Sequence, residues 1–382
     1  MATLDEQLAD LTRGALDVID RTELRTKLAR GTPLVVKLGA DPTAPDLHLG
    51  HSVVLHAMRR FQDHGHRVQF LIGDFTGAIG DPSGRNTMRP QLSCEEISAA
   101  ADTYAQQVAK ILRPEATEIV FNSTWYAAMS VADFIVLASH VTVADMLERD
   151  DFETRHTARV AIGMHELLYP IVQGYDSVAM RADVELGGSD QRFNLLVGRD
   201  VQRAYGQAPQ VVMLMPLLIG TDGVKKMSKS LGNAIAIAES PTSQVQKTMA
   251  ITDATMTQWY GLLSDRTPGD VPRDAKLALA REIVTRYHGH AAATAAIDEY
   301  ERKGAGGEPD SMPELQIAPC SLAEALVAAQ LASTRKEAWG TVSSRGIAVD
   351  GVIATDAAAV LGPGTYVLRS GKNRFARVIV TP

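Results

Sequence analysis

The stretch between Leu34 and His51 constrains this chain most. An apolar run, residues 34–39, ends at the turn Ala40-Asp-Pro-Thr43, and a segment with helical spacing then opens with His48-Leu-Gly-His51. Histidines three residues apart lie on one face of a first helical turn. A helix start also offers unpaired backbone N–H groups and the positive end of the helix dipole, which both favour an anion. The stretch predicts a strand–turn–helix that binds a phosphate group.

The residues that follow extend this pattern into a sheet. A helical segment over 51–64 leads to a second apolar run, Val68–Ile72, and further strand candidates lie at 182–191 and 211–219. A strand–helix–strand order is typical of a right-handed parallel sheet, whose ligands lie at the carboxyl ends of the strands. Residues 1–30 have helical spacing and are expected to pack onto this domain. The predicted class is α/β, with a Rossmann-like parallel-sheet catalytic domain.

Composition shifts predict the remaining domain boundaries. We expect the catalytic domain over 1–220, with its N-terminal helical segment, and a lysine-rich loop with an α-helical domain over 221–302. The Gly- and Pro-rich residues 303–319 are typical of a linker, and a small α+β module is expected over 320–382. Residues 332–382 hold seven Lys or Arg and three acidic residues, whereas the whole chain has a net charge of −7. Such asymmetry is expected of an acidic enzyme with a nucleic-acid-binding appendage.

Other features exclude several classes of protein. No run approaches the roughly eighteen apolar residues of a membrane helix, and residues 1–7 lack the basic and apolar regions of a secretion signal, so a cytoplasmic protein is expected. Cys94 and Cys320 have no Cys or His at metal-binding spacing, which argues against zinc and against a disulfide framework. The chain has neither a Walker A sequence nor GxGxxG, which disfavours P-loop and dinucleotide-binding enzymes.

A second informative stretch is rich in lysine. It runs Val224-Lys-Lys-Met-Ser-Lys-Ser-Leu-Gly232 and follows the apolar run at 211–219. Most short lysine clusters are solvated loops. Here small residues surround Lys226 and Lys229, and a mobile loop could bring their ammonium groups onto a leaving pyrophosphate. With His48 and His51 as donors to the α-phosphate, both stretches would form one ATP-cleaving site. A metal site at the histidines is not expected, because no third ligand lies at zinc spacing.

A third pattern predicts a pocket for a small polar molecule. Tyr169, Gln173 and Asp176 have i, i+4, i+7 spacing and share one face of a helix. A phenol, an amide and a carboxylate that face one pocket could hold an ammonium group and a hydroxyl. The alternative, an exposed polar helix face, is weaker because the flanking residues are apolar, namely Leu167, Leu168, Ile171 and Val172.

Together these motifs resemble class I aminoacyl-tRNA synthetases, and over nearly the whole chain the bacterial tyrosyl-tRNA synthetases. The resemblance rests on Asp41–His51, Gly80–Gly84, Tyr169–Asp176, Gly187–Gln191 and Lys226–Ser230. A tryptophanyl enzyme shares the first and last motifs but is not expected to combine them with Tyr169, Gln173 and Asp176. The chain resembles the branch with Lys37-Leu38 before the Gly-x-Asp-Pro-Thr turn, where the other branch has tyrosine and cysteine; a second partner for the substrate hydroxyl is left open.

The resemblance implies a tyrosine–tRNA ligase that forms tyrosyl-adenylate from L-tyrosine and ATP and charges the 3′ end of tRNA(Tyr). It implies Mg²⁺ with ATP, no metal held by the protein, a homodimer, and an S4-like RNA-binding domain over 320–382. The implied catalytic residues are His48, His51, Lys226 and Lys229. The implied ATP-binding residues are Gly39, Asp41, Thr43, Gly50, Asp190, Met227 and Ser228. The implied tyrosine-binding residues are Asp81, Tyr169, Gln173, Asp176 and Gln191. Arg85 and Arg89 are expected at pyrophosphate, and Arg335, Lys336, Arg345, Lys372 and Arg374 at tRNA.

Two alternatives keep parts of this interpretation. A nucleotidyltransferase that forms a small-molecule adenylate could share the His-x-Gly-His turn, but the basic C-terminal module argues against it. A non-catalytic RNA-binding protein derived from a synthetase would be expected to have lost its histidines and lysines, which are present here. A small oligomerisation module is the alternative for residues 320–382.

Overall fold

The computed structural model describes residues 3–42, 46–81, 94–304, 312–371 and 374–382. Its internal contacts divide the chain into two compact units. The first comprises Met1–Glu239 and Ala250–Leu279, and the second comprises Ser240–Met249 and Ala280–Pro382. No helix in the described ranges has both the length and the apolar composition that crossing a bilayer requires.

The first unit is built on a six-stranded sheet in the order β1-β6-β5-β2-β3-β4. Its strands are β1 (Asp17–Ile19), β2 (Val35–Ala40), β3 (Arg67–Ile72), β4 (Thr117–Phe121), β5 (Val184–Gly188) and β6 (Val211–Met215). All neighbours from β6 to β4 pair parallel, and β1 pairs antiparallel with β6. Strands β5 and β6 are almost entirely buried, which is why they appear in the sequence as continuous apolar runs. The predicted α/β parallel-sheet fold is confirmed.

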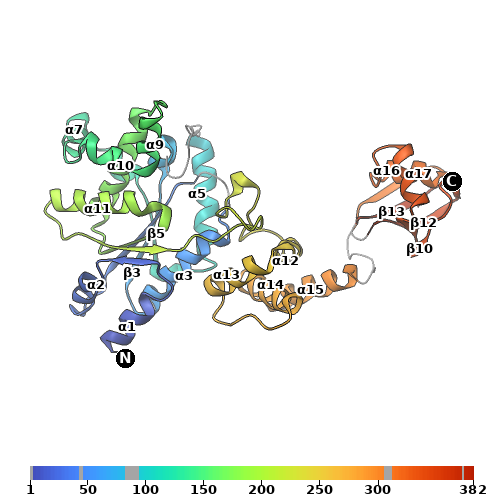
Figure 1. The fold of residues 1–382 in the computed structure, drawn as a ribbon, viewed down its shortest axis with the longest axis horizontal. Coiled ribbons are helices and arrows are strands. Elements are labelled where there is room, and N and C mark those ends of the chain that lie inside the picture. The colour runs from blue at the N-terminus through green and yellow to red at the C-terminus, as the bar shows by residue number, and fades with distance from the viewer. Residues whose placement is uncertain (1–2, 43–45, 82–93, 305–311, 372–373) are drawn as a thin grey trace. The chain divides into compact units, whose positions relative to one another are not determined.

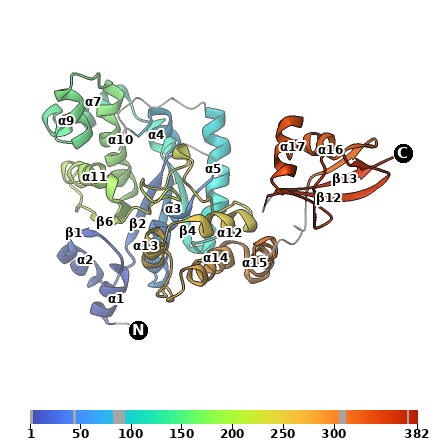
Figure 2. The same ribbon diagram turned by 45° about the vertical axis from the view of Figure 1, so that its right-hand side comes forward.

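Helices cover both faces of this sheet (Figures 1 and 2). α3 (Leu49–Asp63) and α5 (Cys94–Val108) lie on one side, and α10 (Met164–Met180) and α11 (Arg192–Ala204) on the other. The helices change side because the strand order runs outward in opposite directions from β2 and β5, and parallel crossovers are as a rule right-handed. Ligands of open α/β sheets bind at this switch point, outside the carboxyl ends of the strands.

Shorter elements complete the first unit. They are α1 (Leu4–Leu11), α2 (Arg21–Leu28), α4 (Asp74–Ile79), α6 (Ser123–Tyr126), α7 (Val131–Ala138), α8 (Val143–Leu147), α9 (Asp150–Thr157) and α13 (Asp253–Leu263). α14 (Pro272–His288) contributes residues to both units. The predicted helical segment over 1–30 contains α1 and α2, and also the strand β1, which the sequence did not reveal because three residues are too few to show a two-residue period.

The second unit contains helices and a strand-rich C-terminal module. Its helices are α12 (Pro241–Ala250), α15 (His290–Gly304), α16 (Leu322–Ala328) and α17 (Arg335–Ser343). Its strands are β7 (Glu314–Ile317), β8 (Cys320–Ser321), β9 (Ile347–Val349), β10 (Val352–Ile353), β11 (Val360–Leu361), β12 (Gly364–Ser370) and β13 (Arg374–Val380). Five of them form a sheet in the order β10-β9-β12-β13-β7, which packs with α16 and α17 around a core that includes Leu326, Leu368 and Val378.

One predicted boundary needs correction. Residues 314–317 lie within the predicted linker over 303–319, yet they form β7, which pairs parallel with β13. The segment Glu314-Leu-Gln-Ile317 alternates exposed and half-buried positions, and the neighbouring Gly- and Pro-rich residues obscured that two-residue period. The C-terminal module therefore begins before residue 320.

Candidate active site

A cavity of about 850 Å³ lies at the carboxyl ends of β2 and β5, at the switch point of the sheet. Its lining includes Gly39 and Ala40 from the end of β2, and Gly187 and Gly188 from the end of β5. Every described residue that the sequence predicts for catalysis, ATP or tyrosine lines it, namely Gly39, Asp41, His48, Gly50, His51, Asp81, Tyr169, Gln173, Asp176, Asp190, Gln191, Lys226, Met227, Ser228 and Lys229. One cavity thus joins stretches that are far apart in the sequence.

The two histidines begin α3. His48 is its N-cap, and the Nδ1 atom of His48 accepts a hydrogen bond of 3.1 Å from the backbone N–H of Gly50. His51 reciprocates, because its Nδ1 accepts from the backbone N–H of His48 at 3.1 Å. The N–H of Leu49 donates to the carbonyl of Ile235, and that of His51 to the carbonyl of His48. The backbone donors at this helix start are therefore occupied, contrary to the expectation that they would be available to an anion.

The side chains of the same histidines offer donors instead. Burial lowers the pKa of His48 to about 2, with further lowering by His51, Lys229 and Lys226. Burial likewise lowers the pKa of His51 to about 4. Both rings are therefore neutral near pH 7, and each Nδ1 is an acceptor, so the proton of each ring is on Nε2. The pair carries two neutral Nε2–H donors, with the ring centroids 3.9 Å apart.

The position between the two histidines, Gly50, has no room for a side chain. A Cβ atom at Gly50 would lie 2.9 Å from Cε1 and Nδ1 of His48, closer than side-chain contacts allow. Gly73 is comparable, because its Cβ would collide with the side chains of Asp41 and Thr76. At these two positions the backbone approaches a site residue directly.

The lysine-rich loop follows β6 and contributes two ammonium groups. Lys226 Nζ lies 2.5 Å from a carboxylate oxygen of Asp190, and Lys229 forms an ion pair with Asp46. Asn233 shapes the loop, since its Oδ1 accepts from the N–H of Ser228 at 2.7 Å and its Nδ2 donates to the carbonyl of Lys226 at 3.1 Å. Both lysines are thus held beside the histidines by partly exposed carboxylates.

Helix α10 places three predicted residues at the other end of the cavity. The hydroxyl of Tyr169 donates to Asp41 Oδ2 at 2.8 Å, and Asp41 Oδ1 accepts from Thr76 at 2.7 Å. Burial, followed by Asp41 and Asp81, raises the pKa of Tyr169 well above its usual value. The Oε1 atom of Gln173 is buried and has no hydrogen-bond partner among the described residues. A buried amide oxygen that lacks a donor is suited to an incoming ammonium group.

Asp176 is the deepest acid on α10, with 1% of its surface exposed. Its Oδ1 accepts a hydrogen bond from Trp125 Nε1 at 3.0 Å, and its Oδ2 accepts from Asn122 Nδ2 at 3.4 Å. Burial raises its pKa to about 7, although Lys37, Asn122 and Trp125 oppose that rise. The carboxyl group therefore has its pKa close to neutral pH.

Beside it, Gln191 joins the same end of the cavity from the turn after β5. Gln191 Nε2 donates to Asp81 Oδ2 at 2.9 Å, and its Oε1 accepts from Asn194 at 3.0 Å. The residues predicted for tyrosine binding therefore come from α10, from the turn after β5 and from the end of α4. Three separate segments converge on one end of the cavity.

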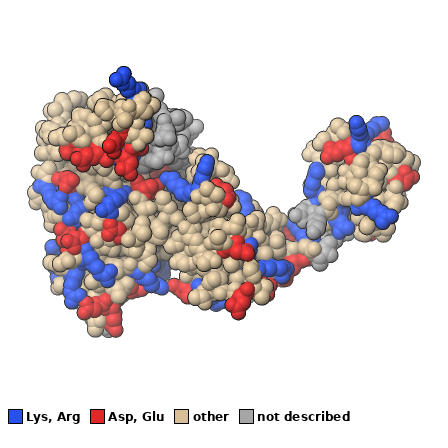
Figure 3. Space-filling view, viewed as in Figure 1, with Lys and Arg blue, Asp and Glu red and all other residues tan. Residues whose placement is uncertain are grey.

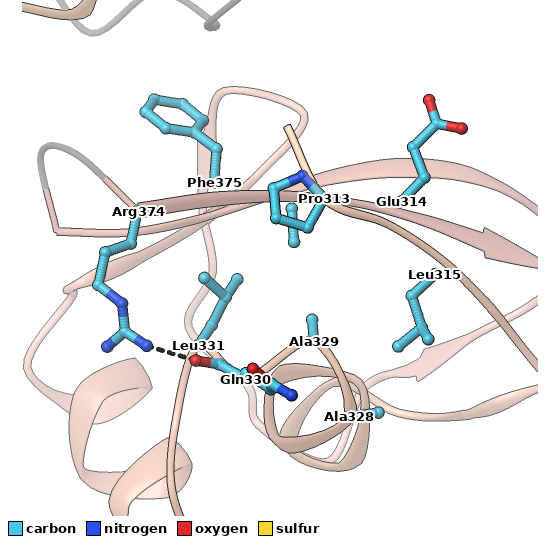
Figure 4. Close-up of a pocket in the computed structure, with 10 residues that line it drawn as sticks. Pro313, Glu314, Leu315, Ala328, Ala329, Gln330, Leu331, Arg374 and Phe375 are labelled. Carbon is cyan, nitrogen blue, oxygen red and sulfur yellow. Dashed lines mark hydrogen bonds between the residues drawn. The ribbon is translucent and has the colours of Figure 1, made fainter. Parts of the chain in front are cut away.

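Several predicted residues lie elsewhere. Thr43, Arg85, Arg89 and Lys372 lie outside the described residues. In the C-terminal module, Arg335, Lys336, Arg345 and Arg374 are exposed. Arg335 pairs with Glu324 at 2.7 Å, and Arg374 donates to the carbonyl of Gln330 beside a smaller pocket of about 460 Å³ (Figure 4). On the face drawn in Figure 3, the Lys and Arg side chains of this module lie apart from one another.

Sequence reasoning missed residues that support the site. Asn122 and Trp125 follow β4 directly, so the rule for the carboxyl ends of parallel strands could have identified them. Asp46 and Asn233 flank the two recognised motifs, but no spacing distinguishes them from ordinary loop residues. Among the described residues, no three His, Cys, Asp or Glu side chains are arranged to hold a metal ion.

Comparisons with known proteins agree with this geometry. Residues 29–302 match the family model described as tRNA synthetases class I (W and Y). The whole chain is 50% identical over 400 residues to a tyrosine–tRNA ligase of Nitratidesulfovibrio vulgaris and 48% identical over 394 residues to one of Mannheimia succiniciproducens, and 100% of each relative is covered.

Solved structures show the same fold. The tyrosyl-tRNA synthetase of Aeropyrum pernix superposes with a TM-score of 0.62 and 21% identity, over 78% of this chain and 99% of that one. The enzyme of Archaeoglobus fulgidus, complexed with L-tyrosine, has a TM-score of 0.62 and 22% identity, over 78% and 100%. The chain belongs to the class I tRNA synthetases of the tryptophan and tyrosine group and, within it, to the tyrosine–tRNA ligases.

Proposed function

We propose that this aminoacyl-tRNA synthetase activates L-tyrosine with ATP to tyrosyl-adenylate and pyrophosphate, and then transfers the tyrosyl group to the 3′ end of tRNA(Tyr). One observation carries the proposal: a single cavity joins neutral histidine donors and two lysines at one end to an orphaned amide oxygen and a buried carboxyl at the other. An adenylate is formed when a carboxylate and an α-phosphate meet in line, which such a cavity allows.

At the nucleotide end, four side chains stabilise the transition state. The Nε2–H groups of His48 and His51 donate to the α-phosphate as negative charge develops on its oxygens. Lys226 and Lys229 exchange their carboxylate partners for the phosphates of ATP, so that two ammonium groups meet the leaving pyrophosphate. The reaction needs no side-chain nucleophile, because the substrate carboxylate attacks phosphorus itself.

Further residues bind the nucleotide in this proposal. Asp41 and Asp190 lie near the nucleotide and its ribose, and Gly39, Gly50, Met227 and Ser228 form the surface against it. Thr43, Arg85 and Arg89 keep their proposed roles at ATP and pyrophosphate. Mg²⁺ enters with ATP, since Mg²⁺ usually retains waters and is held by phosphates with one or two carboxylates. The cavity fits this mode, because it has acidic side chains but no three-ligand cage among the described residues.

At the tyrosine end, the amino acid is held at both of its polar groups. Gln173, whose buried Oε1 lacks a partner among the described residues, accepts from the α-ammonium group, together with Tyr169, Asp81 and Gln191. Asp176 accepts a hydrogen bond from the phenolic hydroxyl. A site built around a substrate hydroxyl rejects the analogue that lacks it, a rule whose standard illustration is the tyrosine enzyme of this class.

A homodimer is part of the same proposal. Apolar side chains on α7, α8 and the start of α10 are unusually exposed, namely Val131 (78%), Ile135 (63%), Val136 (55%), Val143 (62%) and Met164 (67%). Exposed apolar side chains that gather on neighbouring elements are typical of protein–protein interfaces. A second copy of the chain is the proposed partner for this surface, and the enzyme is expected to act in the cytoplasm.

Pyrophosphate exchange tests the activation step. We expect the chain to exchange labelled pyrophosphate into ATP with tyrosine and with none of the other standard amino acids at comparable concentration. Exchange with tryptophan instead, or with no amino acid, would contradict the proposal. Omission of Mg²⁺ should abolish exchange if the metal accompanies ATP.

A truncation tests the role of the C-terminal module in tRNA charging. Because β7 pairs with β13, the cut should remove residues 312–382 rather than only 320–382. We expect tyrosyl-adenylate formation to remain within a few-fold of the full chain while charging of tRNA(Tyr) is lost, because the basic module contacts phosphates. The double variant R335E/K336E keeps the module but reverses two of its charges, and it should show the same pattern as the truncation. Both side chains are exposed, so the substitutions do not disturb a buried core. Charging at the full rate by the truncated chain would show that the module is not used for tRNA.

A further inference from the structure

A buried lysine lines the tyrosine end of the cavity and has no role in the reaction described above. We propose that Lys37 is a positioning residue for the substrate's hydroxyl: its positive charge maintains Asp176 as a negatively charged hydrogen-bond acceptor, and Lys37 itself does not touch the substrate. The inference rests on the proposed function, because it takes Asp176 to be the residue that meets the hydroxyl.

The geometry explains why Lys37 acts through its charge. Its side chain is 0% exposed, and its Nζ lies 2.7 Å from Glu185 Oε1. The same Nζ donates to Ser177 Oγ at 2.8 Å and to the backbone carbonyl of Gln173 at 3.4 Å. An ammonium group has three N–H donors, and these three acceptors use all of them. No donor of Lys37 is left for a bound amino acid.

The position of Lys37 also follows from the sheet. Lys37 on β2 and Glu185 on β5 are direct partners in the parallel register, at the switch point where the cavity opens. Glu185 is 2% exposed, and its Oε2 accepts hydrogen bonds from Ser177 at 3.0 Å and from Gln210. A buried ion pair persists when its remaining hydrogen bonds are satisfied, as they are here. The pair is therefore a fixed part of the cavity floor.

Charged groups on the elements packed against Asp176 shift its pKa in opposite directions. From the sheet, Lys37 favours its ionised form and Glu185 disfavours it. Tyr126 on α6 and Tyr169 on α10 also interact with it, but burial raises the pKa of both phenols, so neither adds charge near pH 7. Trp125 and Asn122 donate neutral hydrogen bonds. Among these groups, Lys37 supplies the favourable charge.

The ionised and protonated forms of Asp176 are closely balanced near neutral pH. Burial raises the pKa of Asp176 to about 7 even with Lys37 in place. A protonated carboxyl group still accepts hydrogen bonds but has lost the negative charge that strengthens them, so loss of the lysine would weaken tyrosine binding at neutral pH. A bound phenylalanine makes no hydrogen bond to this acceptor and leaves it unpaired, so neutralising Asp176 would not weaken phenylalanine binding.

The variant Lys37→Met tests the inference by its pH dependence. We expect the pH profile of kcat/KM for tyrosine in pyrophosphate exchange to move roughly 1–3 pH units toward alkaline pH. At neutral pH, kcat/KM for tyrosine should then fall about tenfold for each unit of this shift. Activity should recover at high pH, and kcat/KM for phenylalanine should not fall. An unchanged tyrosine profile, or an equal loss for both amino acids, overturns the inference.

Glu185→Gln is the second variant, and its expected sign is opposite. It removes the carboxylate that opposes ionisation of Asp176 but keeps the side-chain shape, so the tyrosine profile should move toward acid pH. A purely structural role of the pair would not produce opposite shifts. If Lys37→Met does not fold, the Glu185→Gln profile decides: no shift or an alkaline shift overturns the inference.

The unaltered chain separates this inference from the proposed function. Absence of tyrosine-dependent exchange by the unaltered chain overturns the function and the inference together. Tyrosine-dependent exchange by the unaltered chain, with an unshifted Lys37→Met profile, overturns the inference alone.

Discussion

The two ends of the cavity use the same kinds of charge in different ways. At the nucleotide end, Lys226 and Lys229 are 38% and 27% exposed and pair with carboxylates on loops. At the tyrosine end, Lys37 and Glu185 are 0% and 2% exposed and pair across two strands of the central sheet. Partly exposed ion pairs contribute little to stability and can exchange partners, whereas a buried pair cannot be separated without a large cost.

The difference corresponds to two tasks. In the proposed reaction a phosphate chain arrives, reacts and leaves, so lysines that bind it would have to release their carboxylate partners. A substrate hydroxyl has to be recognised in the same geometry each time, so the charges beneath it are held by fixed hydrogen bonds. The ion pairs at the proposed nucleotide end can therefore exchange partners, whereas the ion pair at the proposed tyrosine end stays in place.

The largest expected effect separates catalysis from binding at the nucleotide end. We expect His51→Ala to lower kcat for adenylate formation by about 10²–10³-fold, because it removes one donor to the developing charge. KM for tyrosine should change little, since tyrosine binds at the other end. The measurement is pyrophosphate exchange over a range of tyrosine concentrations. His66→Gln is the matched control, because His66 is also buried but bonds Gln7 and the Leu34 N–H outside the cavity lining. Equal loss of kcat in both variants would contradict the assignment.

An intermediate effect is expected at the tyrosine end. Asp176→Asn keeps the size of the side chain but removes its negative charge. Hydrogen bonds to charged groups contribute about 1.5–3 kcal/mol, so kcat/KM for tyrosine should fall roughly ten- to hundredfold. For phenylalanine kcat/KM should not fall, so the ratio of kcat/KM for tyrosine to that for phenylalanine should decrease. A variant that loses both amino acids alike would indicate a structural role for Asp176.

The smallest expected effect is a contrast in pH dependence. With saturating tyrosine and ATP, kcat should show no histidine titration between pH 5.5 and 8, because burial lowers the pKa values of His48 and His51 to about 2 and about 4. In contrast, kcat/KM for tyrosine should fall as pH decreases through about 7, because Asp176, whose pKa is raised, becomes protonated. Steady-state exchange across this range checks both. A step in kcat near pH 6.5 would show that the histidines titrate.

The sequence predicted the residues at one end of the cavity more completely than those at the other. The nucleotide end consists of two short stretches, 48–51 and 226–229, whose residue types and spacing carry the chemistry within a few positions. That both stretches face one cavity follows from the parallel sheet, which the apolar periods predicted. The roles of their residues, and the predicted domain limits, stay predictions.

The tyrosine end could be predicted only in part. The face of α10 was visible as a helical spacing, but the groups beneath it come from β2, β5 and the turn after β4. Lys37 pairs with Glu185 through a strand register, and no local pattern reports which residues of two parallel strands are neighbours. The edge strands β1 and β7 were missed for a related reason, since three or four residues are too few to show a period.

The antiparallel strand β1 has a consequence for how the sheet is completed during synthesis. Asp17 pairs with Leu214, so the edge of β6 is covered by residues made near the beginning of the chain. An unpaired strand edge is a template for aggregation, and long-range pairings form late in folding. Because β1 and β5 both precede β6 along the chain, both of its partner strands have been synthesised before β6 leaves the ribosome. Covering this edge therefore depends on closing the chain between Asp17 and Leu214, and not on synthesis of a later strand.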